Sequence, residues 1–357
     1  MSKASGDTKI TIEQIAQDLG CSKTTVSRAL SGKGRVGKEM QKKILAYCKR
    51  IGYQKKETDV SDETFKTSNL GVLLPADQEL NEIPFFQQCL MGICETAASK
   101  LYEVLVIMLE ANDLSRVKRV VQENKVDGMI VTRALTNDPV IQYLESEHVP
   151  LAVIGEVKGH EALYVDDDTV EACTQMTDYL LGRRINRMAL IGGNEQHTVT
   201  QKRLRGFERA HEIYYKKIPQ DLVYLNCATK ADVFAAVEEL AEKCVECIVC
   251  MDDKICSHVL MKLNRMHLSI PKDIKVVSFY DSFFLQNYIP PVTAISFDEQ
   301  ELGRLACEKL IGWLESGDAG EKISPGFDLV LRASTYLLFF RQLWLSKPFL
   351  HHGNICI

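Results

Sequence analysis

Apolar residues recur every three or four positions near the start of the chain, as they do in helices with one buried face. This spacing predicts three helices, over 11–19, 23–30 and about 38–51. Thr11 and Ser22 are natural N-caps for the first two, and a glycine lies between them. Two short helices joined by a tight turn with a glycine match the helix-turn-helix pattern. The first part of the chain is therefore predicted to be an all-α headpiece.

Beyond residue 69 the pattern changes to short apolar runs that alternate with amphipathic stretches. The runs predict buried strands at 70–74, 103–109, 128–132, 151–154, 188–191, 247–251 and 275–279. The stretches between them predict helices at 85–100, 113–124, 169–182, 203–214, 230–243 and 255–264. Such alternation implies parallel sheets in a doubly wound α/β fold, and the length suits two similar lobes. Ligands bind beyond the carboxyl ends of such strands, so Thr132 and Arg133 are candidates to face a cleft.

Charge is divided unevenly along the 357 residues, whose formal net charge is −5. Residues 1–56 hold thirteen Lys and Arg against four Asp and Glu, an excess of nine positive charges. The remaining 301 residues have an excess of fourteen negative charges. A basic module of this kind is a nucleic-acid binder, a membrane-surface patch or a solvated face. Together with the helix-turn-helix pattern, it favours DNA over a three-helix bundle that merely has a basic exterior.

Composition narrows the class of protein further. Apolar residues make up 46% and charged residues 25%, which is typical of a globular chain. The longest apolar runs, such as 70–75 and 336–340, fall far short of the ~20 residues that a membrane span needs. Residues 1–10 are polar and do not look like a secretory signal, and twelve cysteines in such a chain are typical of reduced thiols. We expect a cytoplasmic protein of two or three domains without a membrane partner.

The stretch 12–53 resembles the DNA-binding headpiece of the lactose-repressor (LacI/GalR) family. The resembling residues are Thr11-Ile12-x-x-Ile15-Ala16, Gly20-x-Ser22-x-x-Thr25-Val26-Ser27-Arg28-Ala29-Leu30, Val36 and Ile51-Gly52-Tyr53. In this kind of headpiece the second helix enters the major groove of double-stranded operator DNA. The resemblance implies that Lys23, Thr24 and Arg28 read bases, and Arg28 suits a bidentate guanine contact.

Hydroxyl groups around the same helix are predicted to contact phosphates, which fixes register without reading sequence. They belong to Thr11, Ser22, Thr25, Ser27 and Ser31. The resemblance adds Arg35, which lies in a loop where the family often makes a further DNA contact.

The linker departs from the family pattern. Members usually have P-N-x-x-A-x-x-L here, a hinge helix whose Leu wedges into the minor groove. In this chain Asp59 and Asp62 stand at the places of the small residue and the Leu. Phosphates would repel these carboxylates. We interpret 54–68 either as a disordered polar linker or as a hinge helix that avoids the groove, and we expect weaker operator kinking.

The second part of the chain resembles the family's effector-binding core, which is similar to periplasmic sugar-binding proteins. The resembling pieces are Pro84-Phe85-Phe86, Val126-Asp127-Gly128-Met129-Ile130, Arg203-x-x-Gly206-Phe207, Cys250-Met251-Asp252-Asp253, Val276-Val277-Ser278-Phe279-Tyr280-Asp281, Tyr288-Ile289-Pro290-Pro291-Val292-Thr293 and Leu302-Gly303-Arg304-Leu305-Ala306. Together with the headpiece, the resemblance covers roughly 10–335.

Motif positions in this core imply an effector site. Phe85 and Phe86 would line the cleft, and Arg203 would hydrogen-bond the effector. Asp252 replaces a frequent Asn, and Tyr280-Asp281 replaces the usual Asp-Asp pair. Aromatic stacking with convergent polar groups suits a sugar-sized ligand, although Tyr280 cannot accept bidentate bonds. Packing or a surface ion pair is the alternative explanation for each of these residues.

Four cysteines suggest a different chemistry at first sight. Cys244-x-x-Cys247-x-x-Cys250, with Cys256 beyond, resembles the spacing of a zinc or iron–sulfur site. Cys247 and Cys250 lie in a predicted strand, where residues three apart point to opposite faces, so buried thiols are favoured and no metal or cofactor is expected. A thiol- or metal-responsive regulator is the alternative, and unchanged DNA binding after Ser substitution would remove it. The chain has no G-x-S-x-G, P-loop or H-E-x-x-H motif, so an enzyme is not expected.

Four segments are therefore predicted. They are a helix-turn-helix headpiece over 1–56, a linker or hinge over 57–68, a two-lobed core like a periplasmic binding protein over 69–335 and an atypical tail over 336–357. The apolar tail is either a helix that packs in an oligomer or a frame-shifted or mispredicted end.

We expect a sequence-specific transcription regulator, a repressor, that binds a pseudo-palindromic operator as a homodimer or a larger assembly. A small effector, a carbohydrate, would control it. A solute-binding protein of a transport system is a further alternative, which the headpiece opposes.

Overall fold

The chain divides between Phe65 and Lys66 into two units, each with a core of its own. The computed structural model describes residues 11–31, 37–51, 53, 66–76, 84–110, 113–157, 159–160, 162–317 and 324–336. Most of the predicted linker, with Asp59 and Asp62, and nearly all of the predicted tail lie outside these residues. The four-segment division of the chain stays a prediction.

The first unit consists of the helices α1 (Ile12–Asp18), α2 (Lys23–Ser31) and α3 (Lys38–Arg50). Their apolar faces meet in a small core made by Ile15, Ala16, Val26, Ala29, Ile44 and Cys48. The Thr11 hydroxyl caps α1 by accepting the N–H of Gln14 at 3.3 Å, and the Ser22 hydroxyl accepts the N–H of Thr25 at 3.1 Å at the start of α2. These caps and the turn between them set the angle at which α2 leaves α1.

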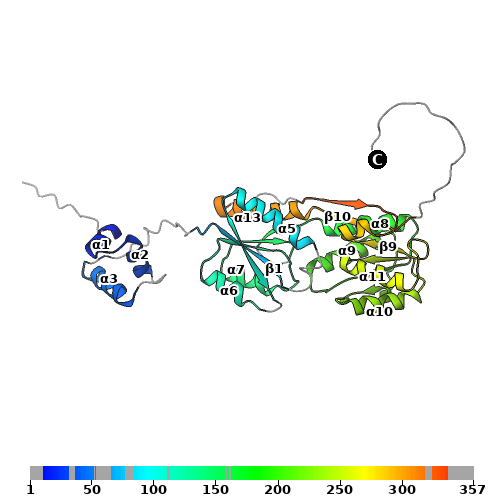
Figure 1. Cartoon of the computed structure of the whole chain (residues 1–357), viewed down its shortest axis with the longest axis horizontal. Helices are drawn as coiled ribbons and strands as arrows, with labels where there is room; N and C mark the ends of the chain where they lie inside the picture. The colour runs from blue at the N-terminus through cyan, green and yellow to red at the C-terminus, as the bar shows by residue number, and fades with distance from the viewer. Residues whose placement is uncertain are drawn as a thin grey trace, which may run out of the picture. The chain divides into compact units, whose positions relative to one another are not determined.

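The first lobe of the second unit is built on a five-stranded parallel sheet with the order β2-β1-β3-β4-β5. The strands are β1 (Asn69–Pro75), β2 (Glu103–Leu109), β3 (Gly128–Val131), β4 (Leu151–Ile154) and β5 (Leu163–Val165). The helices α5 (Phe85–Ser99) and α13 (Glu299–Ser316) cover one face, and α6 (Ser115–Gln122) and α7 (Pro139–Ser146) cover the other (Figure 1). Both faces are apolar because the sheet is buried on both sides.

The second lobe repeats this arrangement on a sheet with the order β11-β10-β9-β8-β6-β7, in which only β11 runs antiparallel to its neighbour. The strands are β6 (Met188–Ile191), β7 (Val223–Tyr224), β8 (Cys247–Cys250), β9 (Lys275–Ser278), β10 (Thr293–Phe297) and β11 (Phe327–Val330). One face packs on α8 (Thr169–Gly182) and α9 (Thr198–Ile213). The other packs on α10 (Lys230–Ala241), α11 (Asp253–Arg265) and α12 (Phe283–Asn287), and a short 3-10 helix, η2 (Gln220–Leu222), precedes β7.

The chain crosses between the lobes three times. It leaves the first lobe after β5, returns after β10 to form α13, and then passes back to β11. Two glycines let α13 lie against α5: a Cβ on Gly92 would come within 1.9 Å of the Gln300 carbonyl oxygen, and one on Gly303 within 2.1 Å of the Cys89 carbonyl oxygen. This contact places the first two turns of α13 against the middle of α5.

The predicted fold class, an all-α helix-turn-helix headpiece with a two-lobed α/β core, is confirmed. Predicted boundaries differ from the structure by one or two residues at several elements, and most at α9, which begins at Thr198 rather than at residue 203. Within the described part of the chain, no helix combines the length and the apolar character that a membrane crossing requires.

Candidate functional site

The predicted DNA-reading side chains share one face of α2. Lys23, Thr24, Ser27 and Arg28 are exposed, whereas Val26 and Ala29 between them are buried in the headpiece core. Thr25 is half-buried, and its hydroxyl is hydrogen-bonded to that of Ser22 at 2.8 Å. The exposed face lies at the first two turns of the helix, where a helix that enters the major groove meets base edges.

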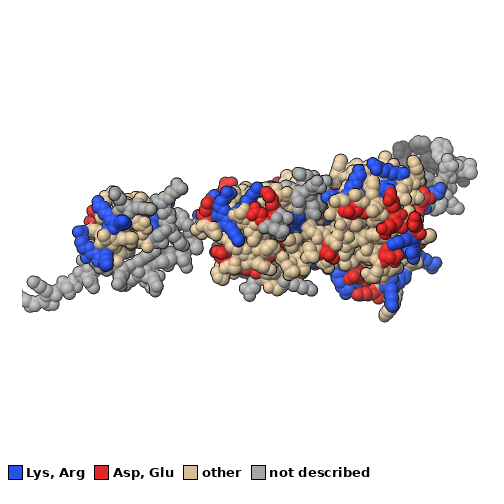
Figure 2. Space-filling view, turned by 90° about the horizontal axis from the view of Figure 1, so that it is seen from below, with Lys and Arg blue, Asp and Glu red and all other residues tan. Residues whose placement is uncertain are grey.

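Charge on this unit is mainly positive, and Figure 2 shows Lys and Arg side chains gathered on the headpiece. Lys23 is not isolated: its ammonium lies 2.6 Å from the Glu13 carboxylate of α1, and this partner holds the pKa of Glu13 below its ordinary value. Both side chains are about two-thirds exposed, so the pair contributes little to stability and Lys23 can leave it for a base edge. Arg35 and the side chain of Ser31 lie outside the described residues.

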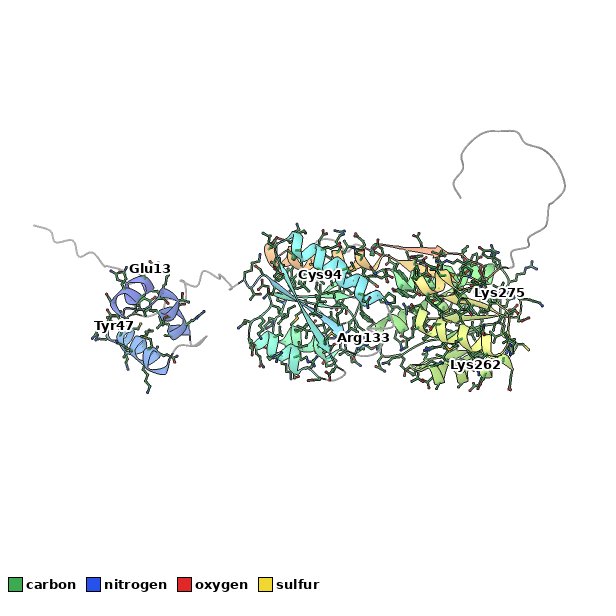
Figure 3. All side chains as sticks on the ribbon, viewed as in Figure 1. Glu13, Tyr47, Cys94, Arg133, Lys262 and Lys275 are labelled. Carbon is green, nitrogen blue, oxygen red and sulfur yellow. The ribbon has the colours of Figure 1, made fainter. Side chains whose placement is uncertain are left out.

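A cavity of about 120 Å³ lies between the two lobes of the core, beyond the carboxyl ends of their parallel strands. Seven of the eight predicted effector residues line it: Phe85, Phe86, Thr132, Arg133, Arg203, Asp252 and Tyr280. The first four come from the first lobe and the last three from the second. Figure 3 labels Arg133 where the lobes meet.

Aromatic rings form one wall of this cavity. The rings of Phe85 and Phe86, at the start of α5, meet edge to face with 5.4 Å between centroids. The ring of Tyr280, after β9, lies 6.5 Å from Phe85, and the Arg203 guanidinium lies 6.0 Å from the Tyr280 centroid. The Nε of Arg203 is buried without a hydrogen-bond partner among the described residues. Its N–H is thus a donor that a ligand in the cavity can satisfy.

Acidic groups and a lysine also line the cavity. Asp166 and Asp167 follow β5, and Lys202 of α9 forms an ion pair with Asp166 and lies 3.6 Å from Glu156. The Asp167 carboxylate accepts a hydrogen bond from the Thr169 hydroxyl. Burial, with Asp166 nearby, nevertheless raises the pKa of Asp167.

The Tyr280 hydroxyl contacts a carboxyl group of the other lobe. It is hydrogen-bonded to Glu299, the first residue of α13, whereas Tyr280 itself belongs to the second lobe. Burial, together with the Glu299 charge, raises the pKa of Tyr280, so the phenol stays protonated and donates. Burial also raises the pKa of Glu299.

Asp252 and Asp281 are held by groups of the protein itself. Asp252 caps α11 by accepting the N–H of Ile255 at 2.7 Å while it lines the cavity. Asp281 is absent from the described cavity lining; its two carboxylate oxygens accept the Arg332 guanidinium at 2.8 and 2.6 Å. The structure therefore brings Asp252 to the cavity and places Asp281 behind it, and the effector role of Asp281 stays a prediction.

Several cavity residues escaped the sequence reasoning. They are Asp166, Asp167, Gly193, Asn194, His197 and Lys202. The rule that identified Thr132, namely a polar residue directly after a parallel strand, also applies to Asp166 after β5 and to Asn194 beyond β6. It failed for Asp166 because β5 has only three residues and was not recognised as a strand.

Three of the four cysteines near β8 are buried thiols, whereas Cys244 is exposed. Cys247 and Cys250 lie in the strand, Cys256 lies in α11, and each has 0% exposure. Burial raises the pKa of Cys247 to about 12 and holds the pKa of Cys250 well above its ordinary value, so the reactive thiolate form is scarce. Among the described residues no group of three His, Cys, Asp or Glu side chains is placed to hold a metal ion.

A basic helix-turn-helix unit joined to a two-lobed core with a small polar and aromatic cavity defines a DNA-binding regulator that senses a small molecule. Family models agree with both parts: residues 11–56 match the bacterial regulatory proteins of the lacI family, and residues 177–335 match the periplasmic binding protein-like domain. This chain belongs to the lacI family of bacterial regulatory proteins and is a DNA-binding transcription regulator. The prediction of a regulator rather than an enzyme is confirmed by this family.

Known proteins resemble nearly the whole chain. The HTH-type transcriptional regulator MalR of Streptococcus pneumoniae serotype 4 is 26% identical over 315 residues, which are 85% of this chain and 92% of MalR. A putative LacI transcriptional regulator from Bacillus cereus subsp. cytotoxis NVH 391-98 is 26% identical with a TM-score of 0.71, over 75% of this chain and 98% of its own. The transcriptional regulator CelR in complex with cellobiose shares the fold, with a TM-score of 0.68, 22% identity and coverage of 91% and 100%.

Proposed function

We propose that this regulator is a repressor whose effector is a carbohydrate bound in the cavity between the lobes. The observation that carries the proposal is the lining itself. It combines the rings of Phe85, Phe86 and Tyr280 with the donor Arg203 and several carboxylates. Sugar rings have apolar faces that stack on aromatic side chains and hydroxyl groups that pair with such polar groups. One similar structure, the CelR–cellobiose complex, holds a ligand of the same class.

On the DNA side, we propose that Lys23, Thr24 and Arg28 read bases, while Ser27 and the hydroxyls of Thr11, Ser22, Thr25 and Ser31 contact phosphates, with Arg35 as a further contact. The shared exposed face of α2 supports the first assignment. We propose that the protein works in the cytoplasm as a homodimer or a larger assembly, because a pseudo-palindromic operator presents two equivalent half-sites. The segments 1–56, 57–68, 69–335 and 336–357 would then serve as headpiece, hinge, core and tail.

Effector binding is tested by thermal unfolding of the full chain in the presence of a panel of mono- and disaccharides. A ligand at 100 times its Kd adds about 2.7 kcal/mol to the free energy of unfolding and raises Tm visibly. Arg203→Met should abolish the rise, and Arg205→Met is the matched control, because Arg205 on the same helix is exposed and paired with Glu212. A panel that leaves the Tm of the wild-type protein unchanged would argue against a carbohydrate effector.

Base reading is tested by selecting bound sequences from a random DNA library. Arg28→Ala should relax preference at one base pair in each half-site, at a cost of about 1–3 kcal/mol for the preferred base. Arg50→Ala is the control because this substitution removes the same charge from α3. The Arg50 guanidinium lies 4.9 Å from the centroid of the Tyr47 ring. Unchanged preference in Arg28→Ala would refute the role that we assign to Arg28.

A further inference from the structure

Two loops, one from each lobe, are joined by backbone hydrogen bonds across the cleft. Residues 134–136 follow β3 in the first lobe, and residues 196–198 precede or begin α9 in the second. Leu135 and His197 form an antiparallel bridge. The Thr198 N–H donates to the Ala134 carbonyl at 3.1 Å, and the Thr136 N–H donates to the Gln196 carbonyl at 2.9 Å. We call residues 134–136 and 196–198 the clasp.

Threonine hydroxyls double the backbone contacts of the clasp. The Thr198 hydroxyl donates to the Ala134 carbonyl at 3.3 Å, and the Thr136 hydroxyl donates to the Gln196 carbonyl at 3.1 Å. Each acceptor carbonyl on one lobe thus receives two donors from a single residue of the other. Four hydrogen bonds, each with a modest net free energy, make a contact that is stable yet reversible.

Each half of the clasp is held in shape by its own lobe. In the first lobe the carboxylate of Asp138, which is 2% exposed, accepts the N–H of Leu135 at 3.1 Å and that of Val140 at 2.9 Å. In the second lobe the Asn194 side chain accepts the N–H of Gln196 at 2.9 Å. Each loop of the clasp therefore keeps its conformation within its own lobe. The two loops lose little conformational entropy when they meet.

The clasp lies at the effector cavity rather than at a distance from it. Ala134, His197 and Thr198 line the cavity together with the neighbouring Arg133. Lys202, one turn along α9 from Thr198, adds the ion pair with Asp166 and the approach to Glu156. Contacts between the lobes thus border the cavity directly.

We propose that the clasp is a latch that holds the two lobes closed over the effector cavity, so that a ligand enters only after the latch opens. The closed state is then the resting state of the chain, and effector exchange is limited by the opening of the clasp. The identity of the ligand rests on the proposed function, whereas the closed resting state does not.

Thr198→Pro removes two of the four hydrogen bonds of the clasp and should disturb little else. Thr198 is the first residue of α9, a position where proline is well tolerated because its N–H is not used within the helix. The preceding His197 has φ −74° and ψ 127°, the extended backbone that a residue before proline prefers. The substitution removes both donors to the Ala134 carbonyl, so the ratio of closed to open molecules should fall about tenfold.

The distance between the lobes is measured on the full chain without ligand or DNA, by pulsed electron resonance between two spin labels. Cys94 of α5 and Cys244 before β8 are exposed and lie on different lobes, and Figure 3 labels Cys94 on the first. Cys21, half-buried in the headpiece, and Cys356 are replaced by Ser so that the labels attach only at the chosen pair.

The labelled chain with an unmodified clasp should give one narrow distribution of distances between the two labels. Thr198→Pro should add a second population at longer distance. Lys230→Pro is the matched control: Lys230 is the exposed first residue of α10 and lies away from the clasp, so the narrow distribution should persist. If Thr198→Pro unfolds the chain, the double variant Thr136→Ala/Thr198→Ala removes only the two hydroxyl bonds and should shift the ratio in the same direction.

A folded Thr198→Pro chain with the wild-type distribution overturns the latch, and so does a broad distribution in the wild-type protein. Neither outcome depends on which ligand binds, so failure of the latch is distinct from failure of the carbohydrate proposal. The sugar panel described above tests that proposal separately.

Discussion

The carboxyl group of Asp253 is buried at the start of α11, directly after the cavity residue Asp252. It is 6% exposed, and its Oδ1 has no hydrogen-bond partner among the described residues. Burial, together with the charge of Asp252, raises the pKa of Asp253 to about 7. The folded chain therefore holds a proton on this group at a pH where the unfolded chain has lost it.

This raised pKa predicts a stability that falls with pH. Since the folded chain binds the extra proton between about pH 4 and pH 7, the free energy of unfolding falls across that window, by about 2–4 kcal/mol. Asp253→Asn carries no such charge, so it should match the wild-type protein at pH 4 and exceed it at pH 8. Urea unfolding at both pH values measures the difference. Asp328→Asn, on the exposed side of β11, is the control, and equal pH profiles for wild-type and Asp253→Asn would contradict the prediction.

The residues of the candidate site were predictable only in part from sequence. Lys202 was missed because a lysine on a helix is usually solvated, and nothing local shows that Asp166 lies opposite it. Asp281 matches a ligand-binding position by motif, yet Arg332, 51 residues along the chain, takes up both of its carboxylate oxygens. Contacts between distant segments decide which polar residue meets a ligand.

At the scale of elements, α5 and α13 pack so closely that neither Gly92 nor Gly303 has room for a Cβ. Gly303→Ala would press a methyl group against the backbone at Cys89, which cannot move as a side-chain end can. We expect a loss of about 2–3 kcal/mol in the free energy of unfolding. Thermal or urea unfolding of the variant measures it.

Gly182→Ala provides the matched control for that prediction. Gly182 is also helical, but a Cβ there would meet only the Tyr214 hydroxyl, at 3.7 Å. Alanine is the better helix former, so this variant should be neutral or up to about 1 kcal/mol more stable. Equal destabilisation by both substitutions would mean that the close approach of α5 and α13 is not the cause.

Elements with a strong local pattern were predicted, and those fixed by their neighbours were not. The buried runs at 188–191 and 151–154 coincide with β6 and β4. By contrast, β7 has only two residues and shows no periodicity. The first turn of α9, Thr198-Val199-Thr200, is β-branched and a weak helix former, so its helical state depends on the lobe around it. That turn carries half of the clasp.

At the scale of the whole molecule, the separation of charge predicts how DNA binding responds to salt. Each phosphate neutralised by the protein adds about −0.9 to the slope of log affinity against log salt concentration. Arg35→Gln, at the further DNA contact that we propose outside the reading helix, should make the slope shallower by about 0.9 for each headpiece that binds. Lys262→Gln, in α11 of the core and paired with Glu238, should leave it unchanged. Operator titrations between low and physiological salt provide the measurement, and equal slopes for the two variants would place the phosphate contacts elsewhere.

The three crossings of the chain have a consequence for biosynthesis. Neither lobe is a continuous stretch of sequence, because α13, near the end of the chain, closes one face of the sheet that begins with β1. Ile130, Ala152 and Val165, on the strands that contact that helix, are buried in the finished protein. While the ribosome translates the second lobe, only α5 covers this apolar face, and the part that α13 will cover stays open. The first lobe is therefore synthesised first but can complete its fold only after residues 299–316 have emerged. Until then the growing chain needs protection from aggregation.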